Sequence, residues 1–212
     1  MRKNKSYYDI EVDTEALILE SGQIDAIFYL QVLKQRKLFL NAGIEPYSVE
    51  EIAKHILQYN KEDIGVDPSN RQPILLYLTS RGGDVDAGFE LIDVILSSKT
   101  PVYTINLGYQ YSMGFLIGLA GHKRFATKYS KVLMHDGSQL IYDSGAKVQD
   151  RMEFQRRVEL RIKEYVLERS KLTEEEYDSK MRVEWYLYAN EAKEKGFVDY
   201  IIGEDCDIDT II

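Results

Sequence analysis

The sequence predicts an α/β fold in which parallel strands alternate with helices. Short apolar runs that stop at a glycine or a polar residue alternate with longer stretches whose apolar residues recur at helical spacing. The repeated alternation favours parallel pairing, because parallel strands need crossover connections. A chain of 212 residues with 44% apolar residues is long enough to bury one substantial core.

The first predicted unit is a strand at residues 37–40 followed by a helix. Ser48 and Glu51 stand three residues apart, which is the spacing of a capping box, and they predict a helix that ends near Tyr59. Residues 60–72 contain glycine, proline, serine and asparagine, so this stretch is expected to be a loop.

Two further units follow along the chain. Residues 74–78 form a continuous apolar run typical of a buried strand, 88–96 carry apolar residues at helical spacing, and 101–107 again favour a strand. Residues 108–121 turn into a short apolar helix, and 124–134 hold two more strand-like pieces. In a fold of this kind we expect the chemistry at the strand ends.

The longest predicted helix covers residues 146–170 and is highly charged. Its apolar residues lie on one face, which needs a partner either within the subunit or on a neighbouring subunit. A short helix at 190–195 and a strand at 198–202 complete the predicted elements. The apolar face consists of Val148, Met152, Val158, Ile162 and Val166, and the last three are expected to be exposed for assembly.

The composition excludes several classes of protein. A net charge of -8 argues against a nucleic-acid surface and favours peptides or proteins as partners. Cys206 is the only cysteine, so there is neither an intramolecular disulfide nor a cysteine-rich metal site, and a reducing compartment is expected. Residues 8–12 alternate apolar and acidic side chains instead of forming a signal core, and no apolar run is long enough to span a membrane. We therefore expect a cytoplasmic protein.

Three predicted strands end in residues that carry chemistry. Gly82 and Gly83 follow a buried strand and leave backbone N–H groups free to face a cleft, although a plain tight turn is the simpler explanation of the pair alone. Ser112 stands at a strand-to-helix junction, where unpaired N–H groups stabilise negative charge, and its alternative role is a helix N-cap. His135 closes an apolar strand, where a lone histidine is more often structural.

Taken together, these ends supply the parts of a serine hydrolase. A hydroxyl nucleophile is weak at neutral pH and needs a base within hydrogen-bond reach. It also needs donors aimed at the oxyanion that develops during attack. Ser112, His135 and the paired glycines provide a nucleophile, a base and backbone donors.

The same residues resemble the proteolytic subunit of the Clp protease family in order and spacing. The resemblance covers roughly residues 33–203 and is specific because four separated motifs agree. The motifs are Ser80-x-Gly82-Gly83-x-Val85-x-Ala87-Gly88, the segment 108–114, Met134-His135, and the segment 191–199.

This resemblance implies a serine endopeptidase with a crotonase-like fold, a spiral of repeated strand-helix units. It implies that Ser112 is the nucleophile and His135 the general base, with the N–H groups of Gly83 and Met113 as oxyanion donors. It implies no cofactor and no metal. The helix at 146–170 would be a protruding handle that pairs two rings.

The resemblance also implies partners and a domain organisation. Seven-membered rings, stacked as double rings, would enclose a chamber, and a Clp-type AAA+ unfoldase would deliver unfolded proteins and peptides to it. Neither a nucleic acid nor a membrane is expected as a partner. The chain divides into an N-terminal segment at 1–32, a peptidase domain at 33–203 and an acidic C-terminal tail at 204–212.

The sequence departs from the family pattern at three places. Ungapped counts from both flanking motifs place Glu184 where the family has its catalytic aspartate. Ser97 replaces an aromatic residue of the ATPase-docking pocket, and the N-terminal segment lacks the family's short apolar, proline-containing start. Other apolar positions of the docking pocket are kept at Tyr77, Ile105 and Leu107.

These departures leave alternatives open. We predict that Glu184 accepts a hydrogen bond from His135, as in Ser-His-Glu triads. Alternatively, Glu184 is a surface carboxylate paired with Lys180. In that case Asp178, a backbone carbonyl or a water molecule would orient His135. The chain as a whole could instead be an impaired subunit that assembles with an active paralogue, or a crotonase-type acyl-CoA enzyme.

Overall fold

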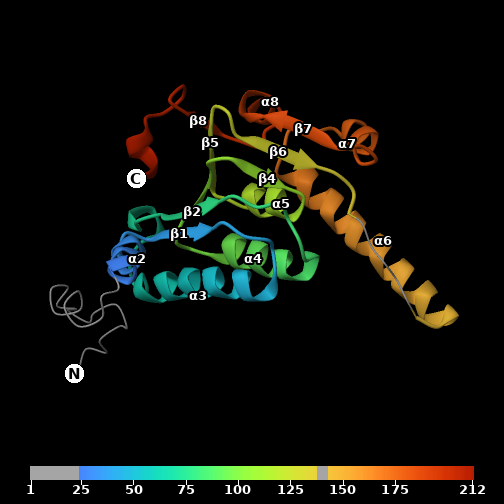
Figure 1. Cartoon of the computed structure of the whole chain (residues 1–212), viewed down its shortest axis with the longest axis horizontal. Helices are drawn as coiled ribbons and strands as arrows, with labels where there is room; N and C mark the ends of the chain where they lie inside the picture. Colours follow the sequence, from blue (N-terminus) through green and yellow to red (C-terminus); the bar gives the residue numbers. More distant parts are fainter. Residues whose placement is uncertain (1–23, 138–142) are drawn as a thin grey trace.

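The computed structural model describes residues 24–137 and 143–212 and contains a five-stranded and a three-stranded sheet. The larger sheet has the order β1-β2-β3-β5-β8, and every neighbouring pair in it is parallel. Figure 1 shows the two sheets with the helices below and beside them. The strands of the larger sheet are β1 (Lys37–Leu40), β2 (Ile74–Leu78), β3 (Val102–Asn106), β5 (Lys123–Thr127) and β8 (Tyr200–Ile202).

Helices cover one face of the larger sheet and build the main core. Alternate strand residues such as Leu76 and Val102 point to this face and pack with buried residues of α3 and α4, among them Ile56 and Leu91. The α/β fold with parallel strands predicted from the sequence is confirmed. The helices of this part are α2 (Ile24–Lys34), α3 (Pro46–Glu62), α4 (Val85–Ser97) and α5 (Met113–Leu119).

The helix α3 begins earlier than its sequence pattern predicted. Glu45 is the N-cap residue and Ser48 is the third helical residue, so Ser48 closes the capping box instead of opening it. The Ser48 hydroxyl accepts the N–H of Glu45 at 3.1 Å. Pro46 starts the helix because its fixed φ suits the first turn and its missing N–H would be unpaired there. The prediction that Ser48 and Glu51 form the box is wrong for this reason.

The smaller sheet holds two strands that the sequence pattern did not predict. In it, β4 (Tyr109–Tyr111) pairs in parallel with β6 (Lys131–Met134), and β6 pairs antiparallel with β7 (Trp185–Tyr188). Three-residue and four-residue strands carry little periodicity, so long-range pairing decides them. The helices α7 (Glu174–Lys180) and α8 (Ala189–Glu194) flank β7 along the chain, and α7 also escaped prediction.

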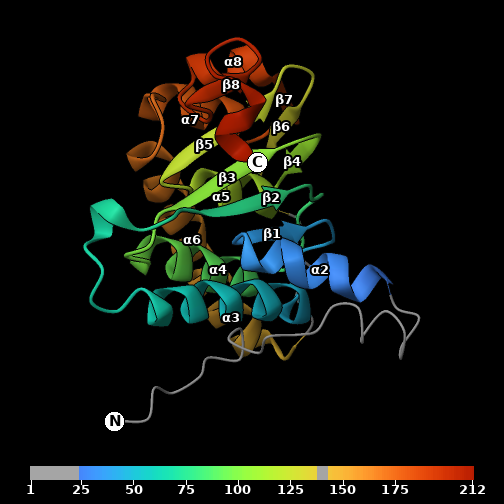
Figure 2. The same ribbon diagram turned by 90° about the vertical axis from the view of Figure 1, so that its left-hand side faces the viewer.

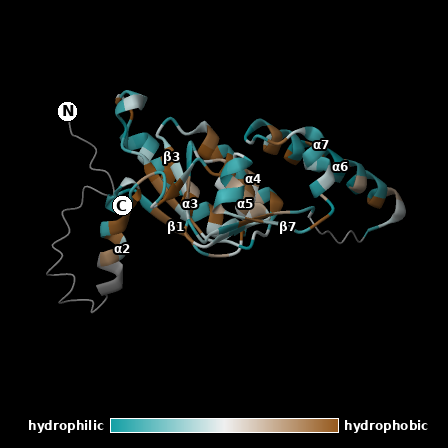
Figure 3. Ribbon diagram, turned by 90° about the horizontal axis from the view of Figure 1, so that it is seen from above, coloured by the Kyte–Doolittle hydropathy of each residue, from teal (hydrophilic) through white to brown (hydrophobic). Residues whose placement is uncertain are grey.

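The long helix α6 (Gly145–Glu168) protrudes from the rest of the structure, with its N-terminal end outermost (Figures 1 and 3). Near its C-terminal end, Val166 is fully buried and Ile162 packs against the core. The expectation that this part of the stripe is exposed is therefore wrong, because it packs within the subunit. The apolar side chains exposed on the protruding part are Met152, Phe154 and Leu160.

The C-terminal residues fold back over the larger sheet. After β8 the chain reverses and ends in a short 3₁₀ turn, η2 (Ile208–Ile211), which lies in front of the sheet in Figure 2. None of the helices in the described part of the chain is long and apolar enough for a membrane crossing.

Candidate active site

Ser112 and His135 lie at the ends of two adjacent parallel strands. Ser112 directly follows β4 and His135 directly follows β6, and Tyr111 is paired with Leu133 in the register of these strands. The N–H of Ser112 donates to the carbonyl of Leu133 at 3.0 Å, which extends the pairing past the end of β4. The parallel register thus places the predicted nucleophile and the predicted base at the carboxyl ends of two neighbouring strands of the smaller sheet.

Ser112 has a strained backbone. Its φ of 54° and ψ of −124° lie outside the regions that ordinary residues prefer, and its side chain makes no capping hydrogen bond to α5. A conformation of this kind costs about 1–3 kcal/mol and persists only where the surroundings enforce it. Ser112 stands at the N-cap position, but its hydroxyl does not serve as a cap.

The glycine pair is packed directly against this serine. Gly82 has a φ of 94°, and a Cβ atom at this position would lie 2.7 Å from the Cβ of Ser112 and 2.9 Å from the nitrogen of Met113. A Cβ atom on Gly83 would lie 2.3 Å from the carbonyl oxygen of Ile44. The two glycines are therefore required by close contacts on two sides, and the turn they form abuts Ser112.

Two backbone N–H groups near the glycine pair and Ser112 have no hydrogen-bond partner among the described residues. Within residues 24–137 and 143–212, neither the N–H of Gly83 nor that of Met113 donates a hydrogen bond. Met113 is the first residue of α5, where the N–H groups lack intrahelical acceptors. These are the two groups that the resemblance to the Clp family implies as oxyanion donors.

Glu184 contacts the imidazole of His135. The Nδ1 atom of His135 lies 2.9 Å from Oε1 of Glu184. The antiparallel register of β6 and β7 explains this contact, because it pairs Met134 with Trp185 and so places His135 opposite Glu184. The histidine side chain is 24% exposed, whereas that of the glutamate is 58% exposed.

A tyrosine that the sequence reasoning missed holds the second oxygen of this carboxylate. The hydroxyl of Tyr186 donates to Oε2 of Glu184 at 3.0 Å. The hydrogen bond with His135, and then that with Tyr186, lowers the pKa of Glu184 below its ordinary value. The sequence contained a signal for this tyrosine: Tyr186 stands two residues after Glu184, and residues two apart in a strand lie on the same face of the sheet. The ring of Tyr186 also meets that of Tyr111 edge to face, with 5.6 Å between the centroids.

The alternative partners for His135 and Glu184 are engaged elsewhere. The carboxylate of Asp178 accepts hydrogen bonds from Lys163 at 2.7 Å and 2.9 Å. The amine of Lys180 lies 5.3 Å from the centroid of the Trp185 ring. Neither Asp178 as an orienting group nor a Glu184–Lys180 ion pair agrees with these contacts.

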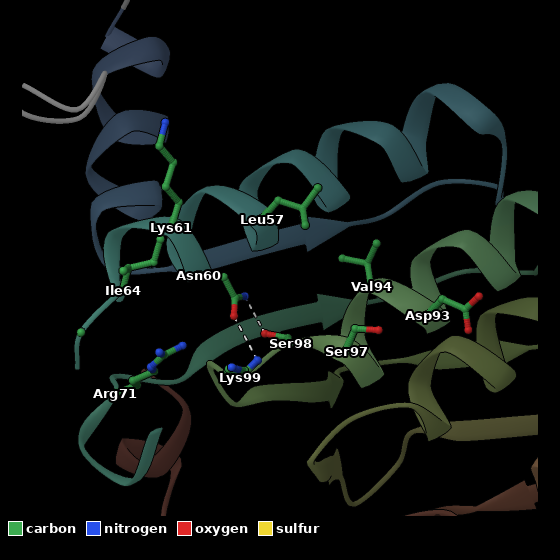
Figure 4. Close-up of a pocket in the computed structure, with 11 residues that line it drawn as sticks. Leu57, Asn60, Lys61, Ile64, Arg71, Asp93, Val94, Ser97, Ser98 and Lys99 are labelled. Atoms are coloured by element: carbon green, nitrogen blue, oxygen red, sulfur yellow. Dashed lines mark hydrogen bonds between the residues drawn. The ribbon is translucent and has the colours of Figure 1, made fainter. Parts of the chain in front are cut away.

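The predicted docking-pocket positions lie on different surfaces of the single subunit. Tyr77 and Ile105 are buried on the face of the larger sheet that the helices do not cover. Ser97 instead lines a groove of about 630 Å³ between α3 and α4, together with Leu57 and Ile64 (Figure 4). Within one chain these positions do not form a single pocket. The charged N-terminal start lies outside the described residues.

Comparison with known proteins shows the family of the chain. A sequence profile described as Clp protease matches residues 20–205. The ATP-dependent Clp protease proteolytic subunit 2 of Treponema pallidum (strain Nichols) is 38% identical over 118 residues, which cover 55% of this chain and 55% of that protein. The ATP-dependent Clp protease proteolytic subunit 1 of Corynebacterium jeikeium (strain K411) is 28% identical over 176 residues, or 82% of this chain and 90% of that protein. The chain belongs to the Clp protease family, whose members are serine-type endopeptidases and whose crotonase-like fold agrees with its mixed α/β architecture.

Proposed function

We propose that this chain hydrolyses peptide bonds of unfolded proteins with Ser112 as nucleophile, His135 as general base and Glu184 as the acid that orients the base. The observation that carries the proposal is the contact between His135 Nδ1 and Glu184 Oε1 at 2.9 Å, beside the strand end that bears Ser112. The strained backbone of Ser112 also supports the proposal, because strained residues cluster at active sites. The Ser112 side chain makes no capping hydrogen bond to α5, which agrees with a role other than capping.

In this mechanism His135 removes the proton of the Ser112 hydroxyl as the oxygen attacks the substrate carbonyl. The tetrahedral intermediate places a negative charge on the former carbonyl oxygen. The N–H groups of Gly83 and Met113, which are unpaired among the described residues, would donate to that oxygen. The imidazolium then protonates the leaving amine, and an acyl-enzyme on Ser112 remains. His135 next removes a proton from a water molecule as that water attacks the acyl carbonyl, and it returns the proton to the Ser112 oxygen as the acid product leaves.

Glu184 would fix the tautomer of His135 and stabilise the imidazolium. A carboxylate that accepts at Nδ1 keeps that nitrogen protonated, so Nε2 remains free to act as base. The lowered pKa of Glu184 keeps the carboxylate charged at neutral pH. Glutamate reaches further than aspartate by one methylene, and the hydroxyl of Tyr186 restrains the longer side chain.

The proposal extends to assembly and partners. The names of both relatives describe ATP-dependent proteolytic subunits. We infer that this chain likewise forms heptameric rings, pairs them as double rings and receives unfolded substrates from a Clp-type ATPase in the cytoplasm. The apolar side chains of Met152, Phe154 and Leu160 on the protruding part of α6 support this, because a lone subunit would leave them in water.

A second candidate is a weakly active subunit that works beside an active paralogue. The observation that favours it is the 58% exposure of the Glu184 side chain, since an exposed carboxylate is screened by water. The acyl-CoA alternative has lost its support, because both named relatives are peptidase subunits.

A serine-reactive fluorophosphonate tests the proposal directly. We expect the intact mass of the protein to rise by one adduct and peptide mapping to place the adduct on Ser112. Ser112→Ala should lose both the adduct and the hydrolysis of a fluorogenic peptide, whereas Ser130→Ala, which alters a buried serine whose hydroxyl bonds the carbonyl of Thr127, should keep both. An adduct on another residue, with full activity in Ser112→Ala, would exclude this nucleophile.

A further inference from the structure

The face of the larger sheet opposite the helices carries a second apolar cluster. Leu75, Tyr77, Ile105 and Phe125 come from three adjacent strands and are each less than 10% exposed. They alternate along their strands with the residues of the main core, as the period of a strand requires. Within residues 24–137 and 143–212 no helix of the main core covers this face, so other elements must exclude water from it.

The C-terminal turn is one such element, beside Tyr103, Ile202 and Cys206, which also pack against the cluster. Ile211 is 2% exposed and belongs to the same cluster. The hydroxyl of Tyr77 donates a hydrogen bond to the carbonyl oxygen of Ile211. Figure 2 shows the turn lying in front of the strands of the larger sheet.

The turn reaches this position through a compact reversal after β8. Gly203 has a φ of 87° and donates its N–H to the carbonyl of Cys206 at 2.8 Å. The carboxylate of Asp205 accepts the N–H of Ile201 and pairs with Lys193. These contacts end at Cys206, so the reversal does not depend on the six residues that follow it.

The grip of the turn on the sheet is narrow. Its flanking residues Ile208 and Ile212 are 59% and 65% exposed, so one side chain and one hydrogen bond make the contact. Next to the turn, Phe39 stacks on Tyr77 with 4.5 Å between ring centroids and remains 54% exposed. A segment held at one point opens far more easily than a core element.

We propose that residues 207–212 are a displaceable cover over an apolar docking surface formed by Leu75, Tyr77, Ile105 and Phe125. The competing ligand is a segment of a partner protein that inserts an aliphatic side chain where Ile211 now lies and offers its carbonyl to Tyr77. With the turn removed, the part of this cluster around Tyr77 that Ile211 covers would lie open beside the exposed ring of Phe39, and apolar patches of this kind mark interaction sites. The partner therefore binds only as the C-terminal turn leaves.

This inference goes beyond the proposed peptidase function and does not depend on it. The resemblance assigned Tyr77 and Ile105 to a docking pocket, but it assigned nothing to the C-terminal residues. The new element is that the chain itself occupies the surface. A partner must displace the turn before it can bind. Its apparent affinity is therefore reduced in proportion to the fraction of molecules in which the turn has left the surface.

The test uses a chain that stops after Cys206, compared with the full chain, both carrying Ser112→Ala to prevent hydrolysis of the probe. The probe is a fluorescein-labelled peptide with the sequence of residues 207–212, followed by fluorescence anisotropy. We expect the shortened chain to bind it at least about tenfold more tightly than the full chain, because the tethered turn competes at a high effective concentration. A matched probe with aspartate at the position of Ile211 should not bind.

A full-length Ile211→Asp variant separates displacement from truncation. It should bind the unchanged probe as the shortened chain does, and Tyr77→Phe should weaken that binding. Equal and weak binding of the probe by all variants would overturn the proposal. Loss of the folded circular-dichroism spectrum in both the shortened chain and Ile211→Asp would also overturn it, since the turn would then be part of the core. None of these results depends on whether Ser112 is the nucleophile.

Discussion

His135 and Glu184, which are 49 residues apart in the sequence, lie with Nδ1 and Oε1 2.9 Å from each other. The contact follows from the antiparallel pairing of β6 and β7, which sets His135 opposite the residue before Trp185. The side chain of Glu184 is one methylene longer than that of the aspartate expected at this position, and its carboxylate still lies within hydrogen-bond distance of the imidazole. The consequences of this pair and its neighbours are open to measurement.

Replacing Glu184 with glutamine should leave a slow peptidase. In a known triad, disabling the acid costs about 10⁴ in turnover without abolishing catalysis, and we expect a loss of up to that order here. The turnover of Glu184→Asp should lie between that of Glu184→Gln and that of the unaltered chain, because the shorter carboxylate does not reach Nδ1 of His135 unless the backbone moves. Steady-state hydrolysis of a fluorogenic peptide measures both variants, and sedimentation should show unchanged assembly. Equal turnover in Glu184→Gln and the unaltered chain would remove Glu184 from the mechanism.

The pH dependence of the same pair has a definite sign. The folded pKa of Glu184 is lowered by its bond with His135, so the stabilisation is present above the unfolded pKa of about 4.5 and is lost as the pH falls through the lower folded value. Urea unfolding at a series of pH values should therefore show a steeper acid loss of stability in the unaltered chain than in Glu184→Gln. Parallel curves for the two proteins would contradict this expectation.

Tyr186→Phe should lower kcat more than it changes KM. The substitution removes only the hydroxyl that holds Oε2 of Glu184 at 3.0 Å. Because water competes for a single exposed hydrogen bond of this kind, the expected loss in kcat is only about two- to fivefold. Tyr188→Phe is the control, since its ring lies on the same strand and faces Lys131 at 5.5 Å. An equal effect of the two substitutions would show that the Tyr186 hydroxyl has no particular role.

Gly82→Ala should abolish most of the activity through a steric clash with Ser112. The added Cβ would lie 2.7 Å from the Cβ of Ser112, and misplacing a nucleophile by about 1 Å costs about a hundredfold in rate. Gly65→Ala is a matched control, because Gly65 has a similar φ of 92° but no atom within 4 Å of the added Cβ. Both variants should lose about 1–2 kcal/mol of stability in urea, and only Gly82→Ala should lose kcat/KM. Full activity in Gly82→Ala would mean that the glycine does not position the serine.

Assembly should depend on the exposed apolar side chains of α6. In sedimentation velocity we expect the unaltered protein to run far above the chain mass of 24.6 kDa. Introducing charge with Phe154→Glu and Leu160→Glu together should give a species of about half the assembled mass, since the protruding helix would join two rings. Glu153→Gln, at a neighbouring exposed position, serves as the control. A monomer at micromolar concentration in the unaltered protein would contradict the proposed assembly.

The sequence by itself determined the parallel α/β architecture and indicated Ser112, His135, Glu184 and the glycine pair as candidate site residues. Apolar runs such as residues 74–78 are buried on both faces, and local composition is enough to predict a strand of that kind. Ser112 stood out because it stands at a strand-to-helix junction, and His135 because it closes an apolar run. The glycine pair stood out because it directly follows a buried strand. Each of these features depends on residues that are close together in the sequence, so it can be predicted without the tertiary structure.

Only the tertiary structure decided which distant groups meet. The short strands β4 and β7 exist because β6 lies between them, and their register alone brings Glu184 to His135 and Tyr186 to Glu184. The packing of Val166 inside the subunit, which the helical spacing of α6 could not distinguish from an exposed stripe, depends on the placement of the whole helix. The seat of Ile211 on Tyr77 joins residues 134 positions apart. Contacts of this range depend on free energies of pairing and burial that no single segment contains, so they appear only when the chain has folded.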